Sequence, residues 1–172
     1  MLERINSTLL GAAAEYFVMS QLLRQDMIAA LAPAGVPDAD IIVSNRVGDK
    51  LAALQVKARR KIGSDGGWHM GQKHEKIIQE SLLYCFVEFG EIADATRCWV
   101  VPSNIVAEAV RDSHAAWLAL PGRNGQPHND TKMRRFLPDY KYETMSSYRA
   151  GWLNQYAEAW HVISKSEMQH ES

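Results

Sequence analysis

The chain has 172 residues, of which 47% are hydrophobic and 23% are charged. This composition excludes a disordered or fibrous protein and favours one globular domain with a hydrophobic core. The formal net charge is -1 and the pI is about 6.6, so the chain as a whole is not attracted to nucleic acid or to an anionic membrane, and any binding to them must rest on local clusters of basic residues.

The first predicted element is a helix over residues 5–24, where Pro is absent and Ala and straight-chain residues dominate. Its apolar residues lie on almost every side, which indicates a helix buried in the fold. The apolar run is interrupted by Glu15 and is shorter than the roughly 20 residues that span a bilayer. We therefore expect no membrane-spanning segment.

Alternating and β-branched residues predict a hairpin in the next part of the chain. The predicted elements are a strand at 27–32, a turn at 33–40, a strand at 41–45, a hairpin turn at 46–50 and a strand at 51–58. A Gly-rich loop, 61–72, and a short helical segment, 73–81, should follow. Aromatic and β-branched content predicts strands at 82–90 and 97–102.

The remainder of the chain is predicted to be helical, with a helix at 104–120, a polar loop at 121–132 and a helix at 143–163. This order predicts an α/β fold with a central mixed sheet of about four or five strands flanked by helices. We expect one domain over residues 1–172, with a core at about 8–102 and a C-terminal helical extension at about 103–165.

Two cysteines, Cys85 and Cys98, lie in apolar runs and match no CxxC or Cys/His metal spacing. They are typical of buried free thiols in a reducing compartment. We therefore expect a cytoplasmic protein.

The hairpin places Asp40 beside two polar residues. If the turn closes between residues 47 and 49, antiparallel pairing puts Asp40 opposite Gln55, Val56 or Lys57. Strand alternation puts Gln55 and Lys57 on one face and Val56 on the other. We expect the Asp40 carboxylate to lie next to a Gln-x-Lys pair.

Glu15 is the second candidate, because no other residue between Arg4 and Arg24 is charged. Its neighbours one helical turn away are small or apolar, and an ionised carboxylate buried there costs several kcal/mol unless it finds a partner, a metal or a proton. One interpretation is a structural ion pair or cap. The other is a ligand set, since oxygen ligands from Glu15, Asp40 and Gln55 would select a hard cation such as Mg²⁺.

A hard cation and a nearby Lys are what phosphodiester hydrolysis needs, because they activate water and neutralise developing phosphate charge. The helix "GAAAEYFVMSQLL", the strand "PDADIIV" and the strand "LAALQVKARRK" together resemble the core of the PD-(D/E)xK nuclease superfamily over about residues 8–102. The resemblance implies the order αβββαβ and a metal-dependent DNA endonuclease. Its site would consist of Glu15, Asp40, Gln55 and Lys57, with Mg²⁺ or Mn²⁺ held by Asp40, Gln55 and Glu15.

Two departures from the superfamily pattern bear on this hypothesis. The literal "PD" is Pro37-Asp38, but the metal-binding Asp of the family abuts the apolar strand, which favours Asp40 over Asp38. Gln55 occupies the acidic position, so one negative charge is lost. A homing-endonuclease-like group is similar in carrying Gln there, and small Holliday-junction-resolvase-like members are similar in their basic residues and in a Gln-containing helix, here "GQKHEK". The alternative is a catalytically inactive domain that binds nucleic acid or a protein partner.

Basic residues cluster around this candidate site, as phosphate contacts require. The candidate DNA-binding residues are Arg59, Arg60, Lys61, Lys73, Lys132, Arg134 and Arg135. A solvated charged face is the alternative for any one of them. Since a duplex has two strands, a homodimer is a further expectation.

An aromatic residue recurs every four positions at Tyr148, Trp152, Tyr156 and Trp160. Such a stripe either stacks on bases or packs a helix onto the protein. We expect packing.

Overall fold

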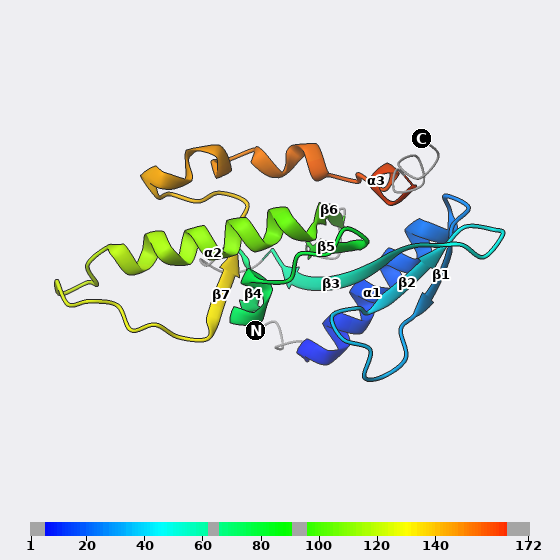
Figure 1. Ribbon diagram of the computed structural model, residues 1–172, viewed down its shortest axis with the longest axis horizontal. Coiled ribbons are helices and arrows are strands. Elements are labelled where there is room, and N and C mark those ends of the chain that lie inside the picture. The colour runs from blue at the N-terminus through cyan, green and yellow to red at the C-terminus, as the bar shows by residue number, and fades with distance from the viewer. Residues whose placement is uncertain (1–5, 62–65, 91–95, 165–172) are drawn as a thin grey trace.

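The computed structural model describes residues 6–61, 66–90 and 96–164 (Figure 1). Its central sheet has five strands in the order β1-β2-β3-β5-β6, and a second sheet pairs β4 with β7. The strands are β1 (Ile28–Leu31), β2 (Ile41–Ser44), β3 (Lys50–Arg60), β4 (Trp68–Gly71), β5 (Leu82–Phe89), β6 (Arg97–Pro102) and β7 (Met133–Phe136). The helices are α1 (Ser7–Leu23), α2 (Ser103–Ala119) and α3 (His161–Ser164), with 3₁₀ helices η1 (Gln72–Glu75), η2 (Glu143–Tyr148) and η3 (Trp152–Tyr156).

The predicted α/β architecture with a mixed central sheet is confirmed. β3 and β5 are parallel, whereas β1–β2, β2–β3 and β5–β6 are antiparallel. Parallel neighbours need a crossover connection, and here the segment between β3 and β5 carries β4 and η1. This crossover brings η1 back toward the middle of the sheet.

The central sheet separates two apolar clusters. On one face, α1 and α3 cover strand residues such as Leu54, Val56 and Cys85. On the other face, α2, the small β4–β7 sheet and the C-terminal segment cover Tyr84 and Phe86. Alternate residues of β5 therefore enter different cores, and every residue from Leu82 to Glu88 is buried.

The helix α1 begins where the Asn6 side chain accepts a hydrogen bond from the Thr8 backbone N–H at 2.8 Å, which satisfies one free donor of the first turn. It buries Ala14, Val18 and Leu22 against the sheet. The opposite side exposes large residues, with Tyr16 62% exposed. The prediction of a helix buried all round is therefore wrong, because α1 packs on the sheet with one face only.

Two parts of the chain, residues 61–81 and the segment after residue 120, differ from the prediction. β4 lies in the predicted Gly-rich loop, the predicted helix at 73–81 is reduced to η1, and β7 was not predicted. Residues 143–163 form η2, η3 and α3 rather than one helix. Gly151 is left-handed with φ 91°, and Ala157 bridges to Trp99 of β6, so the backbone leaves the helical path twice.

The aromatic stripe packs, as expected. Tyr148 and Trp152 meet edge to face with ring centroids 4.8 Å apart, and both join the cluster under α2. Trp160 is buried in the cluster on the other face of the sheet. The prediction of buried free thiols is also confirmed, since Cys85 and Cys98 are buried and form no disulfide. Within the described residues, no helix is both long and apolar enough to cross a membrane.

Candidate functional site

Asp40 and Gln55 come together through the β2–β3 hairpin. The pairs Ile41–Leu54 and Ile42–Ala53 set the register, and the Asp40 N–H donates to the Leu54 carbonyl at 2.8 Å. The Asp40 carboxylate oxygen Oδ2 accepts from the Val56 N–H at 2.7 Å and also from the Gln55 amide. The register predicted from the sequence is confirmed.

Lys57 and Glu15 both lie close enough to Asp40 to feel its charge. Lys57 is half-buried and follows Gln55 on the same face of β3. Burial lowers the pKa of its ammonium, an effect that Asp40 opposes and Lys73 reinforces. Glu15, on α1, lines a shallow pocket of about 250 Å³ together with Asp40 and the loop from Leu31 to Val36. Burial, and then the charge of Asp40, raises the pKa of Glu15.

Three residues absent from the predicted site also lie here. Asp38 adopts a left-handed conformation with φ 57° and binds the Lys73 ammonium at 2.6 Å. The literal "PD" aspartate therefore belongs to the same cluster as Asp40 but is already paired. On η1, the Nδ1 atom of buried His74 lies 2.7 Å from the Tyr84 hydroxyl oxygen.

His74 is neutral near pH 7, because burial and then the charges of Lys57 and Lys73 lower its pKa to about 4. Burial raises the pKa of Tyr84, whose strand position is level with Gln55 in the parallel β3–β5 register. The only sequence signal for these residues was the "GQKHEK" segment. The β3–β5 pairing that brings Tyr84 beside Gln55 leaves no local pattern in the sequence.

The chemistry of the donors fits a hard cation. Burial, and then the charge of Asp40, raises the pKa of Glu15, and a cation bound between the two carboxylates would offset the repulsion between them. Among the described residues, no group of three His, Cys, Asp or Glu side chains is placed to hold a metal ion. The third oxygen would have to come from the Gln55 amide, which can ligate Mg²⁺.

Two of the predicted DNA-binding residues are instead engaged inside the protein. Arg59 pairs with buried Glu88 and lies 3.9 Å above the ring of Trp68. The Arg134 side chain is 2% exposed and pairs with Glu75. Their guanidinium groups are held in structural contacts, which argues against their binding a phosphate.

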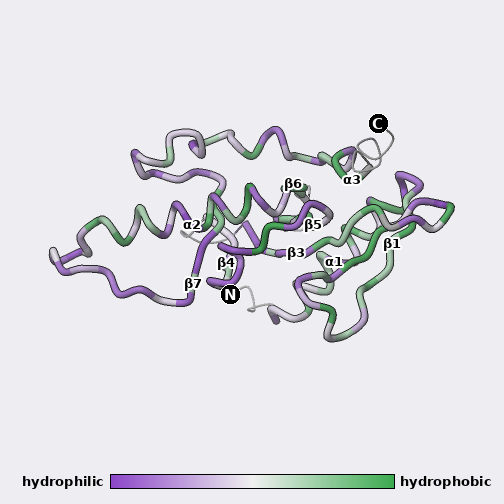
Figure 2. Tube along the Cα trace, in the orientation of Figure 1, coloured by the Kyte–Doolittle hydropathy of each residue, from purple (hydrophilic) through white to green (hydrophobic). Residues whose placement is uncertain are grey.

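The other predicted DNA-binding residues differ in their exposure. Lys61, Lys73 and Lys132 are exposed, and Arg60 and Arg135 are half-buried. Figure 2 shows that the loop between α2 and β7, which ends at Lys132, is largely hydrophilic.

No protein-family model matches the chain, and no curated protein matches it in sequence. A solved structure, that of the bacterial homing endonuclease I-Ssp6803I, is similar to it with a TM-score of 0.52. The match covers 94% of each chain at 15% sequence identity. The chain has a nuclease-like fold. At this identity the similarity concerns the fold, and activity has to be argued from the site.

Proposed function

We propose that the protein is a divalent-metal-dependent DNA endonuclease of the PD-(D/E)xK type. The observation that carries the proposal is the hairpin register, which puts the Asp40 carboxylate beside Gln55, two residues before Lys57 along β3. The nuclease-like fold supports it. A duplex has two strands, so a homodimer with two such sites is part of the proposal.

In this proposal Asp40, Gln55 and Glu15 would hold Mg²⁺ or Mn²⁺. The bound ion would polarise the scissile phosphate and acidify a water molecule. Asp40 is fixed for this role, because its carboxylate accepts a hydrogen bond from the Val56 backbone and its own N–H is bound to Leu54. Such second contacts orient a ligand before the cation arrives.

Lys57 would orient the attacking water as an ammonium or accept its proton as a neutral amine, a form that burial favours by lowering its pKa, and the resulting ammonium would stabilise the negative charge that develops on the phosphate. The ammonium lies near the carboxylates of Asp40 and Asp38, so it is held at the site. Arg60, Lys61, Lys73, Lys132 and Arg135 are the proposed phosphate contacts. Arg59 and Arg134 are proposed to support the site through their buried ion pairs.

A second candidate function is that of an inactive nuclease-like domain that binds nucleic acid or a protein partner. It is favoured by one contact: the Gln55 amide N–H donates to Asp40. In this arrangement the two side chains satisfy each other, and the amide oxygen that would bind a cation points away from Asp40. The two candidate functions therefore differ in one movement. In an active nuclease the Gln55 amide would rotate so that its oxygen binds the cation, and in an inactive domain it would not.

The test is cleavage of supercoiled, linear, branched and single-stranded DNA with Mg²⁺, with Mn²⁺ and with EDTA. We expect nicking or cutting that requires the metal and falls at least about 100-fold in Lys57→Ala. Lys141→Ala is the matched control, because Lys141 is exposed, pairs with Asp139 and does not line the pocket beside Asp40.

Calorimetric titration of Mn²⁺ separates the two candidates. An active site should bind Mn²⁺ in the wild type and lose that binding in Asp40→Asn. Absence of both cleavage and Asp40-dependent Mn²⁺ binding would favour the inactive domain.

A further inference from the structure

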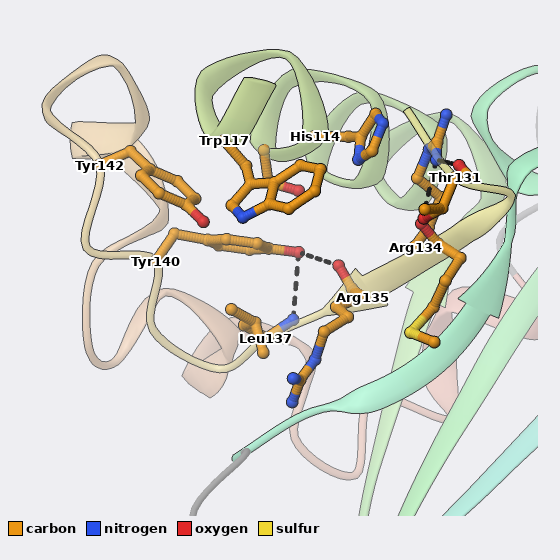
Figure 3. A pocket seen from close by; sticks show the side chains of 10 residues that line it. His114, Trp117, Thr131, Arg134, Arg135, Leu137, Tyr140 and Tyr142 are labelled. Atoms are coloured by element: carbon orange, nitrogen blue, oxygen red, sulfur yellow. Dashed lines mark hydrogen bonds between the residues drawn. The ribbon is translucent and has the colours of Figure 1, made fainter. Parts of the chain in front are cut away.

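A second pocket lies away from the candidate catalytic residues, between the C-terminal half of α2, β7 and the segment that follows β7 (Figure 3). Its volume is about 370 Å³, within the range of small-molecule sites. Arg134 lines it, and the same guanidinium pairs with Glu75 of η1. Since η1 also carries Lys73 and His74, one buried ion pair joins the pocket to the candidate active site.

Aromatic side chains form much of the wall. Trp117 and His114 project from neighbouring turns of α2, and Tyr140 and Tyr142 come from the segment after β7 (Figure 3). The Tyr140 ring is fixed, because its hydroxyl accepts from the Leu137 N–H at 3.1 Å and donates to the Arg135 carbonyl at 3.2 Å. Such a wall is formed before any ligand arrives.

Trp117 already acts as a stacking surface within the protein. The His128 ring, which does not line the pocket, stacks on it with centroids 4.0 Å apart and an interplanar angle of 25°. The indole is therefore held from outside by the α2–β7 loop. Trp117 also lines the pocket, and its ring centroid lies 5.4 Å from that of His114.

Polar groups in the pocket fall into two sets. His114 Nε2 lies 2.8 Å from Asp130 and Arg134 is paired with Glu75, so these groups are satisfied inside the protein. The Trp117 indole N–H and the Tyr142 hydroxyl make no hydrogen bond with other described residues. They are available to a ligand. Arg135 lines the pocket, and the neighbouring Lys132 is exposed.

We propose that this pocket binds one unpaired nucleobase, with the attached phosphate toward exposed Lys132, which lies between the lining residues Thr131 and Met133. Planar aromatic walls bind a base by stacking, and a few N–H and O–H groups read its edge. A base within a duplex is excluded, since its neighbours cover both of its faces. The inference goes beyond the proposed cleavage reaction, because it concerns a separate site and requires no metal.

Tryptophan fluorescence tests the pocket directly, because Trp117 is one of five tryptophans and the one that lines it. Wild type is titrated in EDTA with deoxynucleoside monophosphates, with a single-stranded oligonucleotide, with an abasic strand of equal length and with duplex DNA. Affinity is measured in parallel by calorimetry. We expect quenching by the ligands that carry an unpaired base, and weaker binding of the abasic strand.

Three variants make the test specific. Trp117→Phe keeps a stacking ring but removes the indole, so we expect nearly unchanged affinity with loss of the quenching. Trp117→Leu removes the ring, and we expect affinity to fall about 10- to 100-fold. Trp160→Phe, on the opposite face of the sheet, should keep both the affinity and the quenching.

Titrations with monophosphates and with strands distinguish a free nucleotide from a base within a polynucleotide as the ligand. Quenching by monophosphates assigns a site for free nucleotides, and quenching by strands alone assigns a site for a base within a polynucleotide. The proposal is overturned if no base-containing ligand quenches, if Trp117→Phe quenches like wild type, or if Trp117→Leu binds as tightly as wild type. Lys57→Ala should bind bases normally, so failure of the nuclease proposal and failure of this one are distinguishable.

Discussion

Asp40 and Gln55 face each other across the β2–β3 hairpin, and the Gln55 amide donates a hydrogen bond to the Asp40 carboxylate. The same carboxylate oxygen accepts from the Val56 backbone at 2.7 Å. Two donors to one carboxylate oxygen hold it in a fixed orientation. The pair therefore provides an oriented anion beside Lys57, and the amide orientation controls whether one or two side-chain oxygens are offered to a cation.

Gln55→Glu tests that relationship. A third carboxylate beside Asp40 and Glu15 should raise the affinity for Mn²⁺ at least about tenfold, because ligand charge increases divalent-cation affinity. Without metal the added repulsion should lower the melting temperature. Calorimetry and thermal melts with and without EDTA measure both effects. Gln155→Glu, an exposed change on η3, should alter neither, and an unchanged Mn²⁺ affinity in Gln55→Glu would place Gln55 outside the metal site.

His74 makes stability depend on pH. Its pKa is lowered from 6.5 to about 4 in the folded protein, so the unfolded chain binds more protons between these values and stability falls as the pH falls through them. The contribution is fully present above about pH 6.5. Gln cannot titrate, so His74→Gln lacks this effect. Between pH 7 and pH 4.5 we expect the variant to lose about 2–3 kcal/mol less unfolding free energy than wild type. Urea unfolding at the two pH values measures this difference, and equal losses in both proteins would contradict it.

Arg134 should contribute to stability through its buried pair with Glu75. The Arg134 and Glu75 side chains are 2% and 13% exposed, so removal of the cation leaves a largely buried carboxylate. We expect Arg134→Ala to lose about 3–5 kcal/mol of unfolding free energy in chemical denaturation. A loss below about 1 kcal/mol would show that the pair is not a structural element.

Lys132 provides the contrasting case, because it is exposed on the loop before β7. Lys132→Ala should leave stability within about 0.5 kcal/mol of wild type. It should weaken DNA binding and reduce the slope of log affinity against log salt by about one. Fluorescence anisotropy over a salt series measures the slope. An unchanged slope would remove Lys132 from the phosphate contacts.

Two glycines should respond to alanine in opposite directions. At Gly67, just before β4, a Cβ would lie 2.3 Å from the Leu137 Cδ2 atom and 2.6 Å from the Phe136 carbonyl oxygen, so Gly67→Ala should cost about 1–3 kcal/mol. At Gly11 in α1 a Cβ would have no described atom within 4 Å. Gly11→Ala should stabilise the protein by about 0.5–1 kcal/mol. Thermal melts of the two variants are compared with wild type.

Several elements followed from the sequence by itself, because each depends on neighbours in the chain. Helix-forming residues without Pro predicted α1, and aromatic and β-branched content predicted β5 and β6. The length of one hairpin was enough to predict that Asp40 lies beside Gln55. Antiparallel register over a short turn is local information, and so this part of the candidate site was accessible without coordinates.

Tertiary structure alone decided which other residues join the site and which basic side chains are buried in ion pairs. The parallel β3–β5 pairing brings Tyr84, and with it His74, next to Gln55. Arg134 looked like its neighbour Arg135 in the sequence, yet it is buried against Glu75, 59 positions away. The aromatic residues after 143 have helical spacing, but Gly151 and the Ala157–Trp99 bridge break the helix. Long-range pairing and burial set the partner of each side chain, and no local period of the sequence records them.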